Sequence, residues 1–214
     1  MQPSRVATAL AFLATCAATA AVAGLNPNFT LPLHAKVSSI EPCDGYLPVD
    51  CRTVLPNVSA PAGGPVAVFL FVSNYAELSG VQTAFQVDGS WIFLFGLWDC
   101  QPVQLNARTP APPFGPTAGS IAIAFNCLPG PLLAVIGRMF FMLNTNANGC
   151  LEQVQSSYPF GICVIDCQLA LDQILSGQET RLGKVCVGAG GYDPCVQATA
   201  VEAATWGRIK AQYR

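Results

Sequence analysis

The cysteines constrain this chain more than any other feature. Of its ten cysteines, Cys16 lies in an apolar leader and the other nine follow it. The nine are Cys43, Cys51, Cys100, Cys127, Cys150, Cys163, Cys167, Cys186 and Cys195. In an oxidising compartment, most cysteines of such a chain pair as disulfides. We therefore expect an exported protein whose fold is braced by disulfides.

The spacing of the nine cysteines suggests pairings without fixing them. The pairs considered are Cys43–Cys51, Cys186–Cys195 and Cys100–Cys127, with one more among Cys150, Cys163 and Cys167. A disulfide that closes a loop of roughly thirty residues stabilises a fold by about 3–4 kcal/mol, through the unfolded state. Because nine is odd, one thiol stays reduced or pairs between two chains.

The first 23 residues have the pattern of a secretory signal peptide. Arg5 supplies positive charge, residues 6–20 are apolar, and Ala21-Val22-Ala23 is an A-x-A cleavage site. We expect cleavage after Ala23 and a secreted, extracellular or cell-surface protein. The apolar run is short for a membrane span, and no later segment is long enough for one. The alternative is a lipobox at residues 13–16, which would place a lipid on Cys16.

The composition fits a compact β protein with many turns. Charged residues make up 10% of the chain, against about 25% in an average soluble domain. Hydrophobic residues make up 52%, and the 17 prolines and 19 glycines predict frequent turns. Disorder needs the opposite balance of charge and hydrophobicity. A net charge of −2 offers no electrostatic footprint for nucleic acid, so no nucleic-acid partner is expected.

The stretch from residue 65 to residue 97 predicts three strands. Residues 66–72 are apolar throughout, as in a strand buried on both faces. Residues 81–88 alternate apolar and polar side chains, which indicates a half-buried strand. Asp88-Gly89 is a tight-turn signal, and residues 91–97 are again apolar. We therefore expect the second and third strands to form a hairpin.

Further strands are expected along the rest of the chain, and no βαβ rhythm appears. They span residues 31–38, 119–125, 132–143, 150–155 and 161–166. In the long strand, one face would carry Val135, Met139, Phe141 and Leu143. Residues 110–116 hold four prolines and predict a surface loop. Strands separated by turn signals predict an all-β fold, a two-sheet antiparallel sandwich.

The C-terminal residues predict a short amphipathic helix over residues 200–213. Residues 199–202 have capping-box spacing, and Trp206, Ile209 and Tyr213 recur at helical spacing. Such a helix is marginal alone, so its apolar stripe is expected to dock on the sandwich or on a partner. The expected organisation is a signal peptide at 1–23, a β-sandwich domain with Cys-rich loops at 24–198, and the helix at 199–214.

Side chains for catalysis are scarce. His34 is the single histidine, which leaves little material for triads or histidine-based zinc sites. It is interpreted as a strand-face residue. A glycosidase needs two carboxylates about 5–9 Å apart. The acids considered are Asp44, Asp50, Glu77, Asp88 and Asp99. No catalytic residues are expected, and an enzyme with a carboxylate pair is the alternative.

Three patterns suggest ligands other than proteins. Tyr75, Trp91 and Trp98 would stack on sugars if exposed, although strand aromatics are usually core. Asn144, Asn146 and Asn148 resemble the start of a calcium loop, but Gln155 stands at the twelfth position and Glu152 alone supplies charge. The Cys163-x-x-x-Cys167 pair is interpreted as disulfide chemistry. No cofactor or metal is expected, with calcium as the alternative.

The strand pattern resembles that of cohesins. Ser79-Gly80-Val81-Gln82-Thr83-Ala84-Phe85-Gln86-Val87-Asp88 is similar to a cohesin strand, and residues 119–125 and 132–143 resemble the strands that follow it. The resemblance covers residues 65–144. It implies a cohesin-like jelly-roll sandwich, related in shape to carbohydrate-binding modules, with an adhesive or scaffolding role. The chain also resembles uncharacterised exported bacterial proteins that end in Thr-Trp-Gly-x-Ile-Lys, here residues 205–210. Cohesins typically lack this cysteine framework.

These observations favour a secreted, non-enzymatic module for adhesion, scaffolding or surface assembly. Its expected partner is a protein or a polysaccharide, so carbohydrate binding is included. Self-assembly through exposed strand edges is a further option. The alternative function is a carbohydrate-active enzyme that uses a carboxylate pair.

Overall fold

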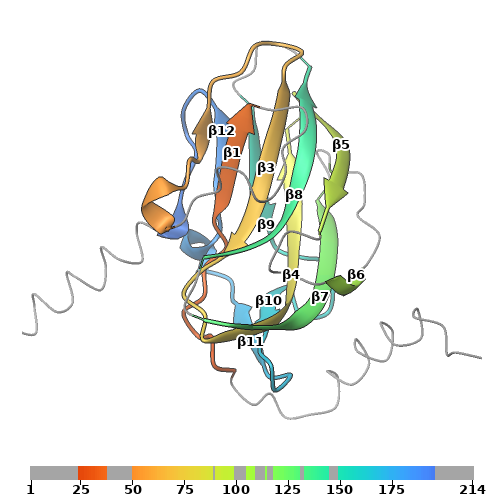
Figure 1. The fold of residues 1–214 in the computed structure, drawn as a ribbon. Coiled ribbons are helices and arrows are strands. Elements are labelled where there is room, and N and C mark those ends of the chain that lie inside the picture. The colour runs from red at the N-terminus through yellow and green to blue at the C-terminus, as the bar shows by residue number, and fades with distance from the viewer. Residues whose placement is uncertain are drawn as a thin grey trace, which may run out of the picture.

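The computed structural model shows a sandwich of two β-sheets (Figure 1). It describes residues 24–37, 50–88, 90–98, 105–108, 114, 118–130, 133–144 and 149–195. The predicted all-β, two-sheet sandwich is confirmed. The signal peptide, Cys16 and the C-terminal helix with Trp206, Ile209 and Tyr213 are predictions that lie outside the described residues. So do Cys43, Asp44, Asp99, Cys100, Asn146 and Asn148.

The described elements are twelve strands and two short 3₁₀ helices. In chain order they are β1 (Leu33–Val37), η1 (Cys51–Thr53), β2 (Asn57–Val58), β3 (Pro65–Val72), β4 (Glu77–Val87), β5 (Trp91–Leu97), β6 (Leu105–Arg108), β7 (Gly119–Pro129), β8 (Ala134–Leu143), β9 (Cys150–Val154), β10 (Ile162–Ile165), β11 (Leu171–Ile174), η2 (Glu179–Arg181) and β12 (Lys184–Val187).

The smaller sheet has four strands in the order β1-β3-β8-β5, with every neighbouring pair antiparallel. The larger sheet is organised around β4, which pairs with β7 along one edge. The other edge of β4 is shared, because Val81 pairs with Val164 of β10 and Phe85 pairs with Gln153 of β9. The strands β11, β12, β2 and β6 extend this sheet further.

The predicted hairpin between β4 and β5 is wrong, because the two strands lie in different sheets. The main-chain N–H of Trp91 donates to the carbonyl of Asp88, and the Asp88 carboxylate accepts from the N–H and hydroxyl of Ser90. Its other oxygen accepts from the N–H of Cys150 at 2.7 Å. The turn signal therefore marks a corner that carries the chain from one sheet to the other.

The strand β3 is buried on both faces, as predicted. Val66, Val68, Leu70 and Val72 belong to the core between the sheets. Ala67, Phe69 and Phe71 belong to a second cluster with Val135 and Phe140 of β8, on the other side of the smaller sheet. A strand in the middle of this sheet thus packs against apolar neighbours on both faces, which explains its unbroken apolar sequence.

The strand β8 departs from strict alternation. Leu70 pairs with Gly137 and Phe71 pairs with Val135, so Ile136 is the additional residue of a β-bulge. The bulge places Ile136 in the main core with Met139, and Val135 in the second cluster. The prediction that Val135 shares a face with Met139, Phe141 and Leu143 is therefore wrong.

Two features predicted to face solvent are shielded instead. Gln82 lies on the polar side of β4 but is buried, and its amide donates to the carbonyl of Gly161 at 2.7 Å. The strand is therefore buried rather than half-buried. Phe114 comes from the proline-rich segment predicted as a surface loop, yet it packs edge-on against Phe85 and Phe93, with ring centroids 5.2 and 4.7 Å away.

Candidate binding surface

Large apolar side chains of β5 and β8 are exposed. These two strands are neighbours at one edge of the smaller sheet (Figure 1). We call this group of side chains the β5–β8 patch. Its members are Ile92, Leu94, Phe95, Leu97 and Met142, each between 37% and 46% exposed. The ladder pairs Ile92 with Met142, while Leu94 is the additional residue of a bulge between Phe93 and Phe95. The patch is thus built on paired strands rather than on a loop.

The patch continues inward into the second cluster. The ring of Phe95 stacks on the ring of Phe140, with centroids 4.6 Å apart and planes 30° apart. Phe140 is buried and packs in the second cluster beside Ala67 of β3. The guanidinium of Arg138 lies 5.8 Å from the centroid of the same Phe140 ring. Phe95 of the patch therefore rests on a buried aromatic ring.

The charges of the smaller sheet have one sign. Its four strands contain no aspartate and no glutamate, and their charged side chains are Lys36 and Arg138. His34 does not add a charge at neutral pH, because burial and then the nearby Lys36 lower its pKa to about 4. Its Nδ1 accepts from the N–H of Leu55 at 3.0 Å, so the proton of the neutral ring is on Nε2.

The three aromatics considered for sugar stacking lie in the core. Tyr75, Trp91 and Trp98 are all buried. Trp91 packs edge-on against Phe141, with centroids 5.3 Å apart. They belong to the interior because bulky strand aromatics supply much of its buried area. They therefore form no exposed stacking platform in the described structure.

The Trp98 side chain is closely packed against two glycines. A Cβ added at Gly137 would lie 2.4 Å from Cε3 of the Trp98 ring, and one added at Gly96 would lie 3.0 Å from Cζ2. The indole therefore occupies space that two glycines, one in β8 and one in β5, leave open. This packing fixes the end of β5 against β8, beneath the patch.

Among the residues that the structure describes, six cysteines form three disulfides, which are Cys51–Cys195, Cys127–Cys167 and Cys150–Cys186. The predicted pairs Cys43–Cys51, Cys186–Cys195 and Cys100–Cys127 are wrong, as is a pair among Cys150, Cys163 and Cys167. The sheet topology explains the correction, because Cys150 and Cys186 stand opposite each other on β9 and β12. Cys163 in β10 is buried and lies outside these three disulfides.

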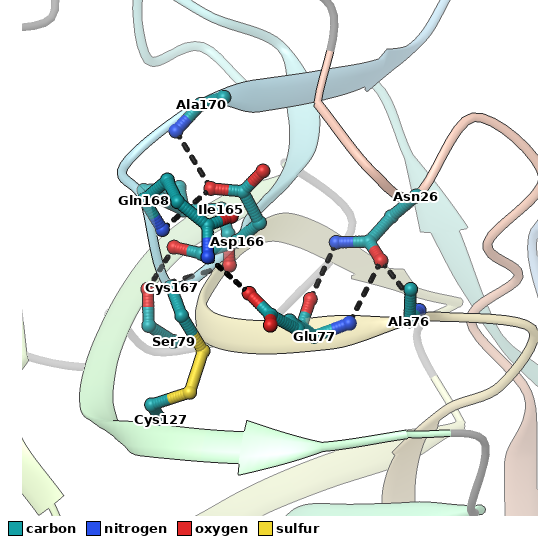
Figure 2. The surroundings of a disulfide bond; sticks show 10 residues. All are labelled: Asn26, Ala76, Glu77, Ser79, Cys127, Ile165, Asp166, Cys167, Gln168 and Ala170. Carbon is teal, nitrogen blue, oxygen red and sulfur yellow. Dashed lines mark hydrogen bonds between the residues drawn. A yellow bond between two sulfur atoms is a disulfide. The ribbon is translucent and has the colours of Figure 1, made fainter.

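The Cys127–Cys167 disulfide lies beside a polar network that joins the start of the described chain to β4 (Figure 2). The side chain of Asn26 accepts from the N–H of Ala76 at 2.7 Å and donates to the carbonyl of Glu77 at 2.6 Å. Nearby, the hydroxyl of Ser79 donates to the carbonyl of Asp166 at 2.6 Å. This network orders the corner where β10 turns into β11.

The described acids considered for catalysis have structural partners. The Asp50 carboxylate caps η1 by accepting from the N–H of Arg52 at 2.7 Å, and Asp88 holds the corner before β5. The Glu77 carboxylate accepts from the side chain of Gln168 at 2.5 Å. Among the residues that the structure describes, no group of three or more His, Cys, Asp or Glu side chains could hold a metal ion.

No helix in the described part of the chain has the length and hydrophobicity needed to cross a membrane. No protein-family model matches the chain, and no curated protein sequence matches it.

Solved structures similar to this chain are cohesin modules. One is the cohesin module of a family 33 glycoside hydrolase from Clostridium perfringens, 9% identical, with 75% of this chain and 98% of that chain covered and a TM-score of 0.46. The sixth cohesin of scaffoldin B from Acetivibrio cellulolyticus, in complex with a dockerin, is 10% identical, with 77% and 97% covered and a TM-score of 0.44. A non-cellulosomal cohesin from Archaeoglobus fulgidus is 12% identical, with 75% and 92% covered and a TM-score of 0.44. These structures come from the family that the strand pattern of residues 65–144 resembles.

The sequence contains a signal for the β5–β8 patch that reasoning from motifs missed. Residues 91–97 read WIFLFGL and have no polar face, although β5 lies at the end of the smaller sheet. A strand without polar side chains at such a position leaves apolar surface exposed. Position at the end of a sheet follows from topology, which the sequence pattern did not give.

Proposed function

We propose that this chain is a secreted, non-enzymatic module that binds a partner protein through the β5–β8 patch. The partner would present apolar side chains flanked by carboxylates. The observation that carries the proposal is the combination of five exposed apolar side chains with a sheet whose strand charges are all positive. Exposed apolar surface of this kind marks interaction sites.

The energetics of burial support a protein partner. Burying a fully exposed large apolar side chain is worth about 1.5–3 kcal/mol, and the patch side chains are 37–46% exposed, so covering each of them is worth about 1 kcal/mol. Because the patch lies on paired strands and its Phe95 ring stacks on the buried Phe140 ring, little ordering is needed on binding. Arg138, which pairs with Leu97 of the patch, would favour a partner with carboxylates and disfavour one with cations.

The proposed location agrees with the cysteine chemistry. Three disulfides join residues that are far apart in the sequence, as expected of a protein that folds in an oxidising compartment. With the signal peptide predicted at residues 1–23, this supports export to the extracellular space or the cell surface. Polysaccharide binding has less support, because the three aromatics considered for it are buried.

The test uses paired charge substitutions on the mature protein. Proteins captured from the medium of the source cells are identified, purified and titrated against wild type and the double variant Ile92→Asp/Met142→Asp. We expect the variant to bind at least a hundredfold more weakly. The matched control is Leu169→Asp/Leu175→Asp, which changes two exposed leucines outside the smaller sheet. The proposal would be contradicted if both double variants lost affinity for the partner equally, or if both kept the wild-type affinity.

A second copy of the chain is the competing occupant of the patch. The end strand β5 has one ladder partner, β8, among the strands that the structure describes. An apolar strand at a sheet end can pair with another chain. Light scattering on the purified protein separates the two cases. If the wild-type protein is a dimer and Ile92→Asp/Met142→Asp is a monomer, the patch binds a second copy of the chain, which would contradict the proposal. A monomeric wild-type protein agrees with the proposal.

A further inference from the structure

Two buried carboxylates accept hydrogen bonds from the first residues of the described chain. The N–H of Leu25 donates to Asp166 at 3.3 Å, and the N–H of Asn26 donates to Asp172 at 2.6 Å. Asp166 is 1% exposed and Asp172 is 8% exposed. The two acids come from the end of β10 and from β11, so this segment is fixed to the β10–β11 corner.

Gly24 lies closer still to one of these carboxylates. A Cβ added at Gly24 would lie 2.3 Å from Oδ2 of Asp172, so a residue with a side chain would clash there. With carbon–carbon and carbon–nitrogen bonds of about 1.5 Å, the nitrogen of Gly24 is within about 5.3 Å of that oxygen. A charge on this nitrogen would therefore lie beside the Asp172 carboxylate.

The carboxylates have little compensating charge in the described structure. Across the described ranges, no ion pair involves Asp166 or Asp172, and the pair identified is Lys184 with Glu152. The Arg181 guanidinium acts on Asp172 at longer range but donates to the carbonyl of Phe29. A buried carboxylate is costly unless hydrogen bonds and an opposite charge compensate it.

The sequence places a cationic group at this point. Hydrolysis of the Ala23–Gly24 bond by a signal-peptide-cleaving protease adds water across the bond. Ala23 leaves with a carboxylate, and the nitrogen of Gly24 becomes an amine that is protonated near neutral pH. The predicted cleavage thus creates a cation at the residue whose missing side chain allows contact with Asp172.

We propose that removal of residues 1–23 creates an α-ammonium group on Gly24 that forms an ion pair with Asp172. The pair fixes the N-terminus of the mature protein at the β10–β11 corner, where Asp166 precedes Cys167 of the Cys127–Cys167 disulfide (Figure 2). Completion of the fold is then linked to processing, and the precursor is less stable than the mature protein. The inference rests on the predicted signal peptide and is independent of the proposed binding function.

The first experiment identifies the N-terminus of the exported protein by mass spectrometry. Gly24 is expected as the first residue, and any other first residue would overturn the proposal. This result depends on processing alone, so it does not require a variant to fold.

The second experiment compares three forms of the mature chain in urea, all with intact disulfides. They begin with Gly24, with acetylated Gly24, and with Ala23 retained before Gly24. Acetylation removes the charge, and the additional alanine displaces it. We expect each change to raise the unfolding equilibrium constant roughly tenfold, in line with the loss of an ion pair near a buried carboxylate. Equal stability of the three forms would contradict the proposal.

The third experiment separates the charge from the hydrogen bond. Asp172→Asn removes the charge but keeps an acceptor oxygen for the N–H of Asn26. We expect acetylation to have at least fivefold less effect in Asp172→Asn than in wild type, and full effect in the control Glu179→Gln, whose carboxylate is exposed. The pKa of the Gly24 amine, followed by NMR, should lie above its ordinary range near 8 and fall in Asp172→Asn. Additive effects with an ordinary amine pKa would refute the ion pair.

Discussion

The two sheets of this sandwich differ in their disulfides, in their acidic residues and in their exposed apolar side chains. The larger sheet contains the disulfide between β9 and β12 and one end of the Cys127–Cys167 disulfide, and its strands include Glu77, Glu152 and Asp172. The strands of the smaller sheet contain neither cysteine nor acid, and β5 and β8 expose apolar side chains. The disulfides of the larger sheet are therefore separate from the proposed binding surface, and we expect each to tolerate changes in the other.

Removing a cross-link from the larger sheet should have the largest effect on stability. The double variant Cys150→Ala/Cys186→Ala opens a disulfide that spans 36 residues. We expect the free energy of unfolding in urea to fall by about 3–4 kcal/mol, because the unfolded chain gains freedom. Partner binding by the folded fraction should persist. A loss of affinity at unchanged fold would break the separation between the two sheets.

The strands of the smaller sheet contain no cysteine, so we expect close packing to contribute to its stability in place of disulfides. Gly137→Ala brings a Cβ against the Trp98 ring, and overpacking of this kind costs about 1–3 kcal/mol. Thermal and urea unfolding measure the loss. The control in the same strand is Met142→Leu, an exposed and similar-sized change that should stay within about 0.5 kcal/mol. Equal stability of the two variants would show that Trp98 does not fix β5 against β8.

Lowering the pH should reduce the stability of the folded protein through protonation of His34, which lies in β1 of the smaller sheet. Its pKa in the folded protein is about 4, because of burial and then the charge of Lys36, against 6.5 in the unfolded chain. The unfolded state therefore binds more protons between these values, so the stabilising contribution is complete above pH 6.5 and is lost as pH falls toward 4. The loss, discounted for partial solvent screening, is up to about 2 kcal/mol.

The variant His34→Asn isolates this contribution, because an amide oxygen can accept from the N–H of Leu55 as Nδ1 does. Urea unfolding of both proteins at several pH values is compared. We expect the difference between them to change across pH 4 to 6.5 and to be constant above it. A constant difference over the whole range would show that His34 titrates normally.

The smallest effect on stability is expected at the patch itself. Ile92→Asp/Met142→Asp changes two partly exposed side chains and places two like charges opposite each other in the ladder, which costs about 0.5–1 kcal/mol. The melting temperature should therefore stay close to that of wild type while partner binding is lost. A large fall in melting temperature would mean that the patch is needed for the fold.

The positions of the strands could be predicted from the sequence, but the pairing between strands could not. Alternation and turn residues locate β3, β4, β5 and β7 because side-chain periodicity is a local property. The partner of β5 is not local, since Asp88-Gly89 defines a turn equally well for a hairpin or for a corner between sheets. The same limit explains the cysteines, because Cys150 and Cys186 become neighbours when β9 and β12 pair.

The candidate surface was predictable only in part. The apolar sequence of β5 indicates a strand without a polar face, but exposure depends on its place at the end of the sheet. The bulge at Ile136 also matters, because it turns Val135 away from Met139 and toward the second cluster. Bulges of one residue reverse the face of every side chain beyond them, and the sequence of β8 shows no clear sign of one.

The two methionines outside the predicted signal peptide offer the most direct test of a binding face on the smaller sheet. Met142 lies in the patch and is exposed, whereas Met139, three residues away on β8, is buried in the core. The methyl groups of both are labelled with ¹³C and followed by NMR while the partner is added. The account predicts that the Met142 signal shifts and the Met139 signal stays. Saturating binding that leaves the Met142 signal unchanged would contradict it.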